Sequence, residues 1–294
     1  MVAILGLMAG QAAAVPDPGQ LPRKKAKAPT PKTDVAQPGG KRMIFPVLGR
    51  ARYTDTWGAA RAQGGHEGTD IMAPWRALAI ATEAGRVKFH TTSARAGCML
   101  YLYGNSGTTY LYVHLNNDLT AKNDNRGRCV AGTSYAPGLK DGARVVAGEP
   151  IAFVGDSGDA NGIEHHLHFE LHPKGHHAVN PFAHLNRAWR LLFAAPRKGE
   201  TSLWLKGAVL TQQAEALKVN VQSLAVRSTG LKLNGISRPV SLAISPFTLI
   251  EGAFGRLAGE KRATVWTEIF PVTLDAQLGK AGALTAERVL LSAR

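Results

Sequence analysis

Cysteine is scarce in this sequence: among 294 residues it occurs only at Cys98 and Cys129. Neither residue belongs to a Cys-x-x-Cys pair, which argues against a dithiol redox motif and against a zinc knuckle built from thiolates. In an exported chain an even number of cysteines can close a disulfide. A closed loop of about thirty residues would stabilise the fold by about 3 to 4 kcal/mol. Two free buried thiols are the alternative.

Acidic residues are also few, with 21 Asp and Glu against 35 Lys and Arg, so the formal net charge is +14 and the isoelectric point is near 10.0. Such an excess of positive charge favours polyanionic surroundings. Nucleic acid, an anionic membrane surface and anionic cell-wall polymers all fit, so charge alone does not select among them. The hydrophobic content of 45% is ordinary, and the length allows one large or two medium domains with their own cores.

The N-terminal region lacks the basic start of a typical secretion signal, but residues 2–10 are apolar and Ala12–Ala14 are the small residues that signal peptidases accept. The apolar segment is too short to anchor the chain across a bilayer. We therefore expect a signal peptide over residues 1–14, a secreted or cell-envelope location in the periplasm or cell wall, and no stable membrane insertion. An apolar N-terminal helix is the alternative.

Residues 15–42 are poor in apolar side chains and rich in proline, lysine and arginine. A segment of this composition cannot bury enough surface to offset the entropy lost on ordering. We expect a flexible basic linker, which either attaches the protein electrostatically to an anionic wall or is simply solvated.

From residue 43 to about 187 the sequence lacks long amphipathic helices and consists of short apolar runs separated by turn residues. This pattern predicts an antiparallel β domain. The polar stretch 116–140, which contains Cys129, predicts an exposed loop of unusual length, and long loops inside compact domains tend to be functional. A short helix is expected over residues 183–194. The apolar runs that predict strands lie at residues 78–82, 86–89, 99–103, 110–115, 144–146 and 150–154.

Residues 198–294 contain no histidine, no cysteine and no clustered acids, so we expect no second active site there. Apolar and polar residues alternate in short runs at residues 217–221, 240–244, 263–267 and 284–289. These runs predict a small β domain, and the favoured architecture is a five-stranded barrel of the oligonucleotide/oligosaccharide-binding type. A plain β-sandwich is the competing assignment. The expected fold class is thus all-β, in two domains.

One stretch, residues 164–171, combines three histidines and two glutamates with the alternation of a strand. Because side chains along a strand alternate between two faces, His166, His168 and Glu170 would share one face, and the apolar residues between them the other. Neutral imidazole is a common zinc ligand and titrates near neutral pH. The strand therefore presents either a metal or catalytic site, or a polar face on an edge strand.

A catalytic zinc site needs three protein ligands and one open position for water. His66 and Asp70 offer a nitrogen and a carboxylate oxygen four residues apart, and the glycines around them let the backbone bend so that both side chains converge. His168 would complete the three ligands. His166 and His114 are then left for acid–base chemistry.

These residues carry a resemblance to the lysostaphin/LytM-type zinc endopeptidases, which cut peptidoglycan peptides. The resemblance covers about residues 43–187. It rests on three ordered motifs, His66-x-x-x-Asp70, Tyr112-Val113-His114-Leu115 and His166-Leu167-His168-Phe169-Glu170, and on shorter matches at 45–47, 142–145, 148–151 and 179–181.

The resemblance implies that His66, Asp70 and His168 bind Zn²⁺ as the cofactor. His166 and His114 would be catalytic: they would orient and deprotonate the attacking water and stabilise the oxyanion. Departures from the family pattern at 76–78, in the Cys129 loop and at His165 bear on specificity more than on catalysis. His165 is either a substrate contact or, as we favour, an outward strand residue, and Glu170 either orients an imidazole or is a plain strand residue. We expect His172, His176 and His177 to be solvated.

The leading hypothesis is an exported zinc metalloendopeptidase that hydrolyses peptide bonds in peptidoglycan cross-links or cross-bridges, with anionic cell-wall polymers as a further partner. The alternative is a LytM-like protein that binds the wall or activates another hydrolase without cutting. A nucleic-acid binder that uses the C-terminal barrel also fits the charge. The barrel sequence lacks the interleaved aromatics of a stacking platform, so we expect no nucleic-acid partner.

Overall fold

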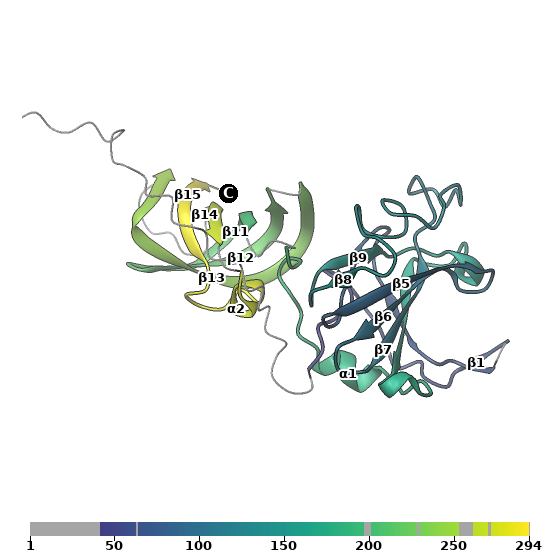
Figure 1. Ribbon diagram of the computed structural model, residues 1–294. Coiled ribbons are helices and arrows are strands. Elements are labelled where there is room, and N and C mark those ends of the chain that lie inside the picture. The colour runs from purple at the N-terminus through teal and green to yellow at the C-terminus, as the bar shows by residue number, and fades with distance from the viewer. Residues whose placement is uncertain are drawn as a thin grey trace, which may run out of the picture. The chain divides into compact units, whose positions relative to one another are not determined.

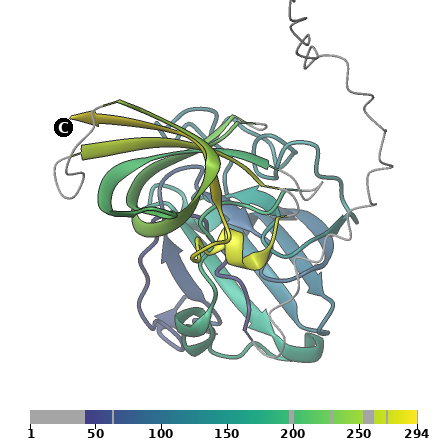
Figure 2. The ribbon, with the colours of Figure 1, turned by 90° about the vertical axis from the view of Figure 1, so that its left-hand side faces the viewer.

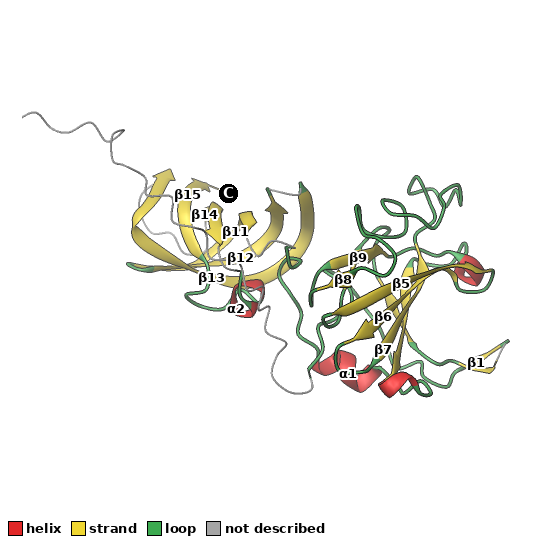
Figure 3. Ribbon diagram, in the orientation of Figure 1, coloured by secondary structure: helices red, strands yellow, loops and turns green. Residues whose placement is uncertain are grey.

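The computed structural model describes residues 42–62, 64–196, 201–227, 230–252, 261–269 and 272–293. Strands dominate these residues and helices are few and short (Figure 3). The strands form a mainly antiparallel sheet system and a separate barrel (Figure 1), which confirms the all-β fold class. The predicted signal peptide and all of the predicted linker except Arg42 lie outside the described residues, and the predicted domain boundaries stay predictions.

The larger sheet has six strands in the order β3-β10-β7-β6-β5-β8, with antiparallel neighbours. Since β10 lies between β3 and β7, the sheet brings residues near 70, 114 and 168 together. Two small sheets, β1-β2 and β4-β9, accompany it. The strands are β1 (Ala60–Arg61), β2 (Gly64–Gly65), β3 (Thr69–Met72), β4 (Leu78–Ile80), β5 (Gly85–Ser93), β6 (Gly97–Gly104), β7 (Thr109–Leu115), β8 (Arg144–Val145), β9 (Pro150–Phe153) and β10 (His166–His172).

The predicted alternation along β10 is present. Leu167, Phe169 and Leu171 are buried in the hydrophobic core of this sheet, while the residues between them face the opposite side. The register pairs His168 with Asp70 on one neighbouring strand and with Val113 on the other. Burial of the apolar face therefore determines which side chains of β10 are presented for chemistry.

The polar stretch between β7 and β8 is a long loop, as predicted. A disulfide between Cys98 on β6 and Cys129 joins this loop to the sheet, with the two Cα atoms 5.2 Å apart. The disulfide interpretation of the two cysteines is thus confirmed and the free-thiol alternative is wrong. The loop also has hydrogen bonds of its own, among them those that Asp124 accepts from the backbone of Leu119 and Thr120, and it is bonded to the rest of the domain, for example through Arg76 and the Gly132 carbonyl.

Helices are confined to short segments in the described residues. The helix predicted for residues 183–194 is shorter than expected: α1 spans Phe182–Arg187, and Ala188 already has an extended backbone. The helix ends because Trp189 pairs with the backbone of Met43 and Phe45 and so forms a bridge beside Ile44. Two turns of 3-10 helix lie at Gly158–Ala160 and Pro173–Gly175. None of the helices that the structure describes has the length and apolar character needed to cross a membrane.

The C-terminal strands close into a five-stranded barrel in the order β11-β12-β13-β15-β14 (Figure 1, Figure 2), which rules out the sandwich alternative. All neighbours are antiparallel except β13 and β15. Alternate residues of the strands fill the interior, for example Leu203 and Leu205. The elements are β11 (Thr201–Gln213), β12 (Ala216–Val226), β13 (Leu231–Gly252), β14 (Lys261–Ile269), α2 (Leu274–Gln277) and β15 (Thr285–Ala293).

The barrel carries a stacked pair of tryptophans, contrary to the expectation that it lacks interleaved aromatics. Trp204 on β11 and Trp266 on β14 are direct cross-strand partners, and their rings stack with centroids 6.4 Å apart. Trp204 is 40% exposed, and the guanidinium of Arg288 lies 5.2 Å from the ring of Trp266. The two tryptophans are 62 positions apart in the sequence, so local patterning could not pair them.

Candidate metal centre

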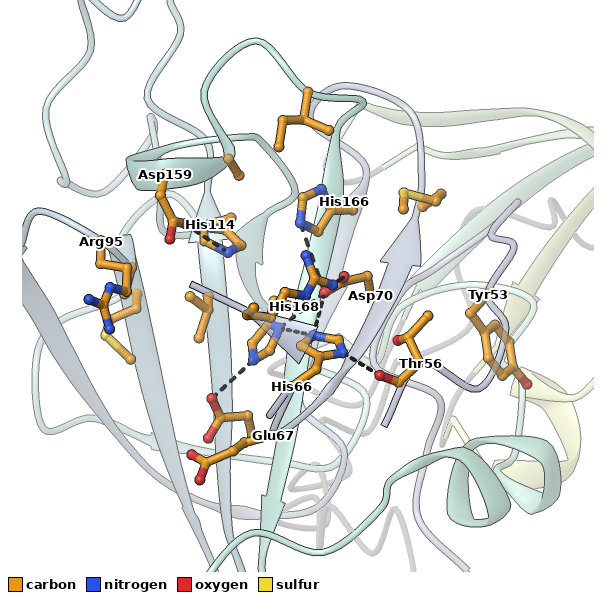
Figure 4. A pocket seen from close by; sticks show the side chains of 18 of the residues that line it. Tyr53, Thr56, His66, Glu67, Asp70, Arg95, His114, Asp159, His166 and His168 are labelled. Atoms are coloured by element: carbon orange, nitrogen blue, oxygen red, sulfur yellow. Dashed lines mark hydrogen bonds and ion pairs between the residues drawn. The ribbon is translucent and has the colours of Figure 1, made fainter. Parts of the chain in front are cut away.

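A cavity of about 850 Å³ lies over the polar face of the larger sheet (Figure 4). All five residues predicted for the site line it, as does Glu170. They come from four places: the loop between β2 and β3, β3 itself, β7 and β10. The structure therefore brings together every residue that the sequence analysis assigned to metal binding or catalysis: His66, Asp70, His114, His166 and His168.

Three donor atoms form a small triangle at the floor of this cavity. His66 Nε2 lies 3.1 Å from Asp70 Oδ1 and 2.9 Å from His168 Nδ1, and the last two atoms are 3.0 Å apart. A tetrahedral zinc ion bound at its usual ligand distances separates its ligand atoms by about 3.3 Å. Two imidazole nitrogens and one carboxylate oxygen at this spacing fit a zinc ion with one position left open.

The other ring nitrogens of these two histidines are already engaged. His66 Nδ1 donates to the carbonyl oxygen of Thr56 at 2.9 Å, and His168 Nε2 donates to Glu170 Oε1 at 3.0 Å. These bonds place the ring protons away from the triangle and leave His66 Nε2 and His168 Nδ1 with free lone pairs. A ligating histidine commonly gives its second nitrogen to a carbonyl or carboxylate in this way.

Asp70 is held as a ligand with one free oxygen. Its Oδ2 accepts from Arg61 Nη2 at 2.6 Å, so Oδ1 alone points at the two imidazoles. Burial opposes ionisation of Asp70, but hydrogen bonds with His168 and His66 outweigh it and hold the pKa of this carboxyl well below its usual range. The residue is a carboxylate at any pH at which the protein would work.

The same cluster favours positive charge at His168. Burial alone would lower the pKa of this imidazole, but its hydrogen bonds with Asp70 and Glu170 raise that pKa to about 9. The two carboxylates thus create a negative potential at the triangle. A negative potential of this kind stabilises a proton or a metal cation at the same point.

Gly68 is required by the packing of the site. The glycines here were expected to let the backbone bend, and at Gly68 the absence of a side chain matters as well. A Cβ atom at Gly68 would lie 2.7 Å from the ring of His168 and 2.8 Å from the carbonyl oxygen of Phe169. Both contacts are shorter than side chains tolerate, and one of them is to backbone. Glycine at this position therefore allows the strand that carries His168 to approach β3 closely.

His114 and His166 face the triangle from the other side of the cavity (Figure 4). His114 Nδ1 donates to Ser157 O at 2.8 Å and His166 Nδ1 donates to Glu164 O at 2.8 Å. Each ring therefore presents an unprotonated Nε2 when it is neutral. The two ring centroids are 5.2 Å apart, and His166 Nε2 lies 4.0 Å from Asp70 Oδ1.

His114 stays neutral far below the usual range of histidine. Burial and the nearby His166 lower the pKa of His114 to about 4, although its hydrogen bond with the Ser157 carbonyl acts in the opposite direction. The backbone of His114 is also unusual, with a φ of 58°. Residues in this left-handed region cost energy and are concentrated at functional sites.

The remaining predicted histidines divide into three groups. His172, which we expected to be solvated, is partly buried, and its Nε2 lies 2.7 Å from Glu170 Oε2 at the end of β10. His165 precedes β10 and is half-buried, away from the cavity, so it is not an outward strand residue. His176 and His177 are exposed, as expected. Glu170 accepts hydrogen bonds from both His168 and His172. The sequence showed only that the three residues share one face of the strand, and it did not predict these bonds.

Several solved structures are similar to part of this chain. They include a candidate glycyl-glycine endopeptidase LytM from Ruminococcus gnavus (25% identity, TM-score 0.40, covering 51% of this chain and 63% of the other). Another is the catalytic domain of lysostaphin from Staphylococcus simulans (22% identity, TM-score 0.37, covering 46% of this chain and 92% of the other). A third is a zinc-containing peptidase from Vibrio cholerae (22% identity, TM-score 0.34, covering 47% of this chain and 38% of the other). The chain thus spans less than two thirds of the Ruminococcus protein.

A comparison with curated proteins finds no match. A comparison with family models gives a match to peptidase family M23 over residues 64–181. This segment begins at β2 and ends just before α1, so it contains all five predicted site residues. The chain therefore contains a domain of peptidase family M23.

Proposed function

We propose that this protein is an exported zinc metalloendopeptidase that hydrolyses peptide bonds in peptidoglycan cross-links or cross-bridges. The observation that carries the proposal is the triangle of donor atoms from His66, Asp70 and His168, faced by the free nitrogens of His114 and His166, within an M23 domain. The three donor atoms would serve as ligands of a metal ion, and the two further imidazoles would accept and donate the protons that hydrolysis requires.

Zinc is the metal that this set of donors fits best. Imidazole nitrogen with a carboxylate oxygen in a three-ligand site is typical of catalytic zinc, whereas calcium and magnesium prefer oxygen donors only. When bound, zinc supplies a Lewis acid that acidifies water and polarises a carbonyl. His66, Asp70 and His168 would hold it, Arg61 would fix the orientation of Asp70, and Thr56 and Glu170 would fix the two imidazoles.

The chain's own acid–base groups are His114 and His166. Both present Nε2 to the cavity, so each can accept a proton there from water that attacks a peptide carbonyl. Once protonated, the same nitrogens donate to the oxygen that gains charge or to the departing amine. The backbone carbonyls of Ser157 and Glu164 hold both rings in the tautomer that this role requires.

Glu170 provides a graded test of the metal assignment. Replacing Glu170 by Gln is expected to weaken zinc binding about 10- to 100-fold, because the amide no longer fixes and polarises the His168 ring as a carboxylate does. Titration against a competing chelator measures the change. Glu67→Gln is the matched control, since Glu67 lines the same cavity without a bond to any histidine ring that the structure describes, and it should leave the affinity unchanged. Equal affinities of the Glu170→Gln variant and the native chain would contradict the role given to Glu170.

The proposed activity is tested by digestion of isolated peptidoglycan sacculi. The zinc-loaded chain is expected to release soluble muropeptides, and mass spectrometry should show cross-linked species replaced by products with new amino termini. A chelator should stop the release, and added zinc should restore it. Binding of the zinc-loaded chain to sacculi with no new amino termini would instead support a wall-binding or activator protein, the alternative raised by the sequence.

A further inference from the structure

A second cluster of metal-ligating side chains lies outside the candidate metal centre. Asp118 comes from the loop after β7, and Asp156 and His165 come from the segment between β9 and β10. One donor atom from each of the three lies within 4.8 Å of the others. None of these residues lines the cavity over the sheet, so the cluster is a separate place in the fold.

The two carboxylates in this cluster are buried, and each uses only one oxygen. Asp118 is fully buried and its Oδ1 accepts from Asn125 N at 2.7 Å. Asp156 is 1% exposed and its Oδ2 accepts from Gly162 N at 3.2 Å. The second oxygens, Asp118 Oδ2 and Asp156 Oδ1, and the ring atom His165 Nε2 are all buried and lack a hydrogen-bond partner among the described residues.

Three unpartnered donors at one buried point call for a ligand. A buried carboxylate without a partner is costly, and two beside each other repel, so the pair must share a proton or a cation. A proton shared between the two carboxylates would give both of them a partner, but His165 Nε2 would still lack one. A divalent cation would serve all three, because two carboxylate oxygens and one imidazole nitrogen are the mixed donors of first-row transition metals.

We infer that Asp118, Asp156 and His165 bind a second divalent transition-metal cation, of the zinc class, at a site distinct from the catalytic triangle. Calcium and magnesium fit less well because an imidazole nitrogen is not among their usual ligands. The inference does not depend on peptide cleavage. It concerns a structural ion and stands or falls on the number and place of bound metals.

The position of this cluster gives the ion a consequence for the catalytic histidines. His165 directly precedes β10, which begins with His166, and Asp156 directly precedes Ser157, whose carbonyl orients His114. The two loops that the ion would join are already in contact through Asn125 Nδ2 and Asn161 Oδ1 at 2.9 Å. An ion here would fix the segment that orients both acid–base rings.

Zinc counting tests the inference on the full chain. After chelator treatment, the chain is loaded with excess zinc, freed of unbound metal and analysed by elemental mass spectrometry. We expect two zinc ions per native chain and one in the Asp156→Asn variant, which keeps an oxygen for Gly162 N–H. Asp141→Asn is the matched control: it removes an exposed carboxylate from the β7–β8 loop, which also carries Asp118, and should retain two ions.

Further variants separate this site from the catalytic one. His66→Ala should also bind one ion, and the double variant His66→Ala/Asp156→Asn none. If the catalytic assignment alone is wrong, the native chain and His66→Ala bear the same count, while Asp156→Asn still has one ion fewer. Equal counts in the native chain and Asp156→Asn would overturn the inference and assign the carboxylate pair to a shared proton.

Thermal unfolding distinguishes loss of the ion from failure of the variant to fold. Without metal, Asp156→Asn should melt no lower than the native chain, since it removes a buried charge. With zinc, the native chain should gain stability from the second ion, and Asp156→Asn should lack that gain. An equal gain in both proteins would contradict the inference even if both are well folded.

Discussion

Replacing His168 by alanine is expected to reduce muropeptide release by about 10⁴-fold or more and to remove the zinc ion from the catalytic triangle. His168 Nδ1 contributes one of three ligand atoms, at 2.9 and 3.0 Å from the other two, so its loss leaves only two ligands on the ion. A metal in such a site supplies several kcal/mol of transition-state stabilisation, and each 1.4 kcal/mol is about a factor of ten in rate. Initial rates of amine release from sacculi, with zinc content measured on the same samples, give both quantities.

The matched control is His176→Ala, which removes an exposed histidine from the loop after β10 and should keep both the activity and the zinc. The two variants have the same composition, so any general effect of losing an imidazole cancels. Alanine at His168 also removes one of the two imidazole partners of Glu170, and circular dichroism should show that the sheet persists. Cleavage at the native rate by His168→Ala would exclude the triangle as the catalytic centre.

The sequence predicted the chemistry of β10 because a half-buried strand has a strict period of two. Leu167, Phe169 and Leu171 had to face the core, so His166, His168 and Glu170 had to face away from it. The barrel could be predicted for a similar reason, since its strands alternate in the same way. Which side chains of a half-buried strand face the core depends on neighbouring positions in the sequence, so it can be predicted without knowing the rest of the fold.

The other half of the site could not be obtained from local patterns. His66 and His168 are 102 positions apart, and they meet only because β10 pairs with β3 in a register that sets His168 opposite Asp70. Strand order is decided by the packing of the whole sheet. The two segments could be placed together only from the number of ligands that a zinc site needs and from the resemblance to a known family. The Asp118, Asp156 and His165 cluster depends on two loops and carried no such resemblance.

His114 shows where the strand period itself fails. Strict alternation would put His114 on the buried face with Tyr112, which is fully buried. The pairing of β7 with β6 shifts register there: Cys98 pairs with Leu115 and Leu100 with Tyr112, so two residues of β7 stand opposite one of β6. Such a bulge turns a side chain to the other face and is common beside active sites. The positive φ of His114 is part of this turn.

The variant His114→Asn is expected to lower the rate of peptide hydrolysis about 10²- to 10⁴-fold while the zinc content stays at the native value. Asparagine tolerates the left-handed backbone that the bulge imposes, so the change removes the imidazole without adding strain. The ring of His114 is not among the three ligands, and its Nε2 is the atom that faces the reacting water in the proposed mechanism. Single-turnover rates at saturating substrate, beside elemental analysis, separate this effect from loss of metal.

The pH dependence of hydrolysis by the native chain tests the same role in a second way. Burial and the nearby His166 lower the pKa of His114 to about 4, so its base form is present above that value and is lost as the pH falls through it. If His114 accepts the proton, the acid limb of the rate profile should lie near pH 4, well below the usual histidine pKa of about 6.5. In His114→Asn this limb should disappear from the residual rate. A native rate in that variant, or a limb that persists unchanged in it, would assign the proton transfer to His166 alone.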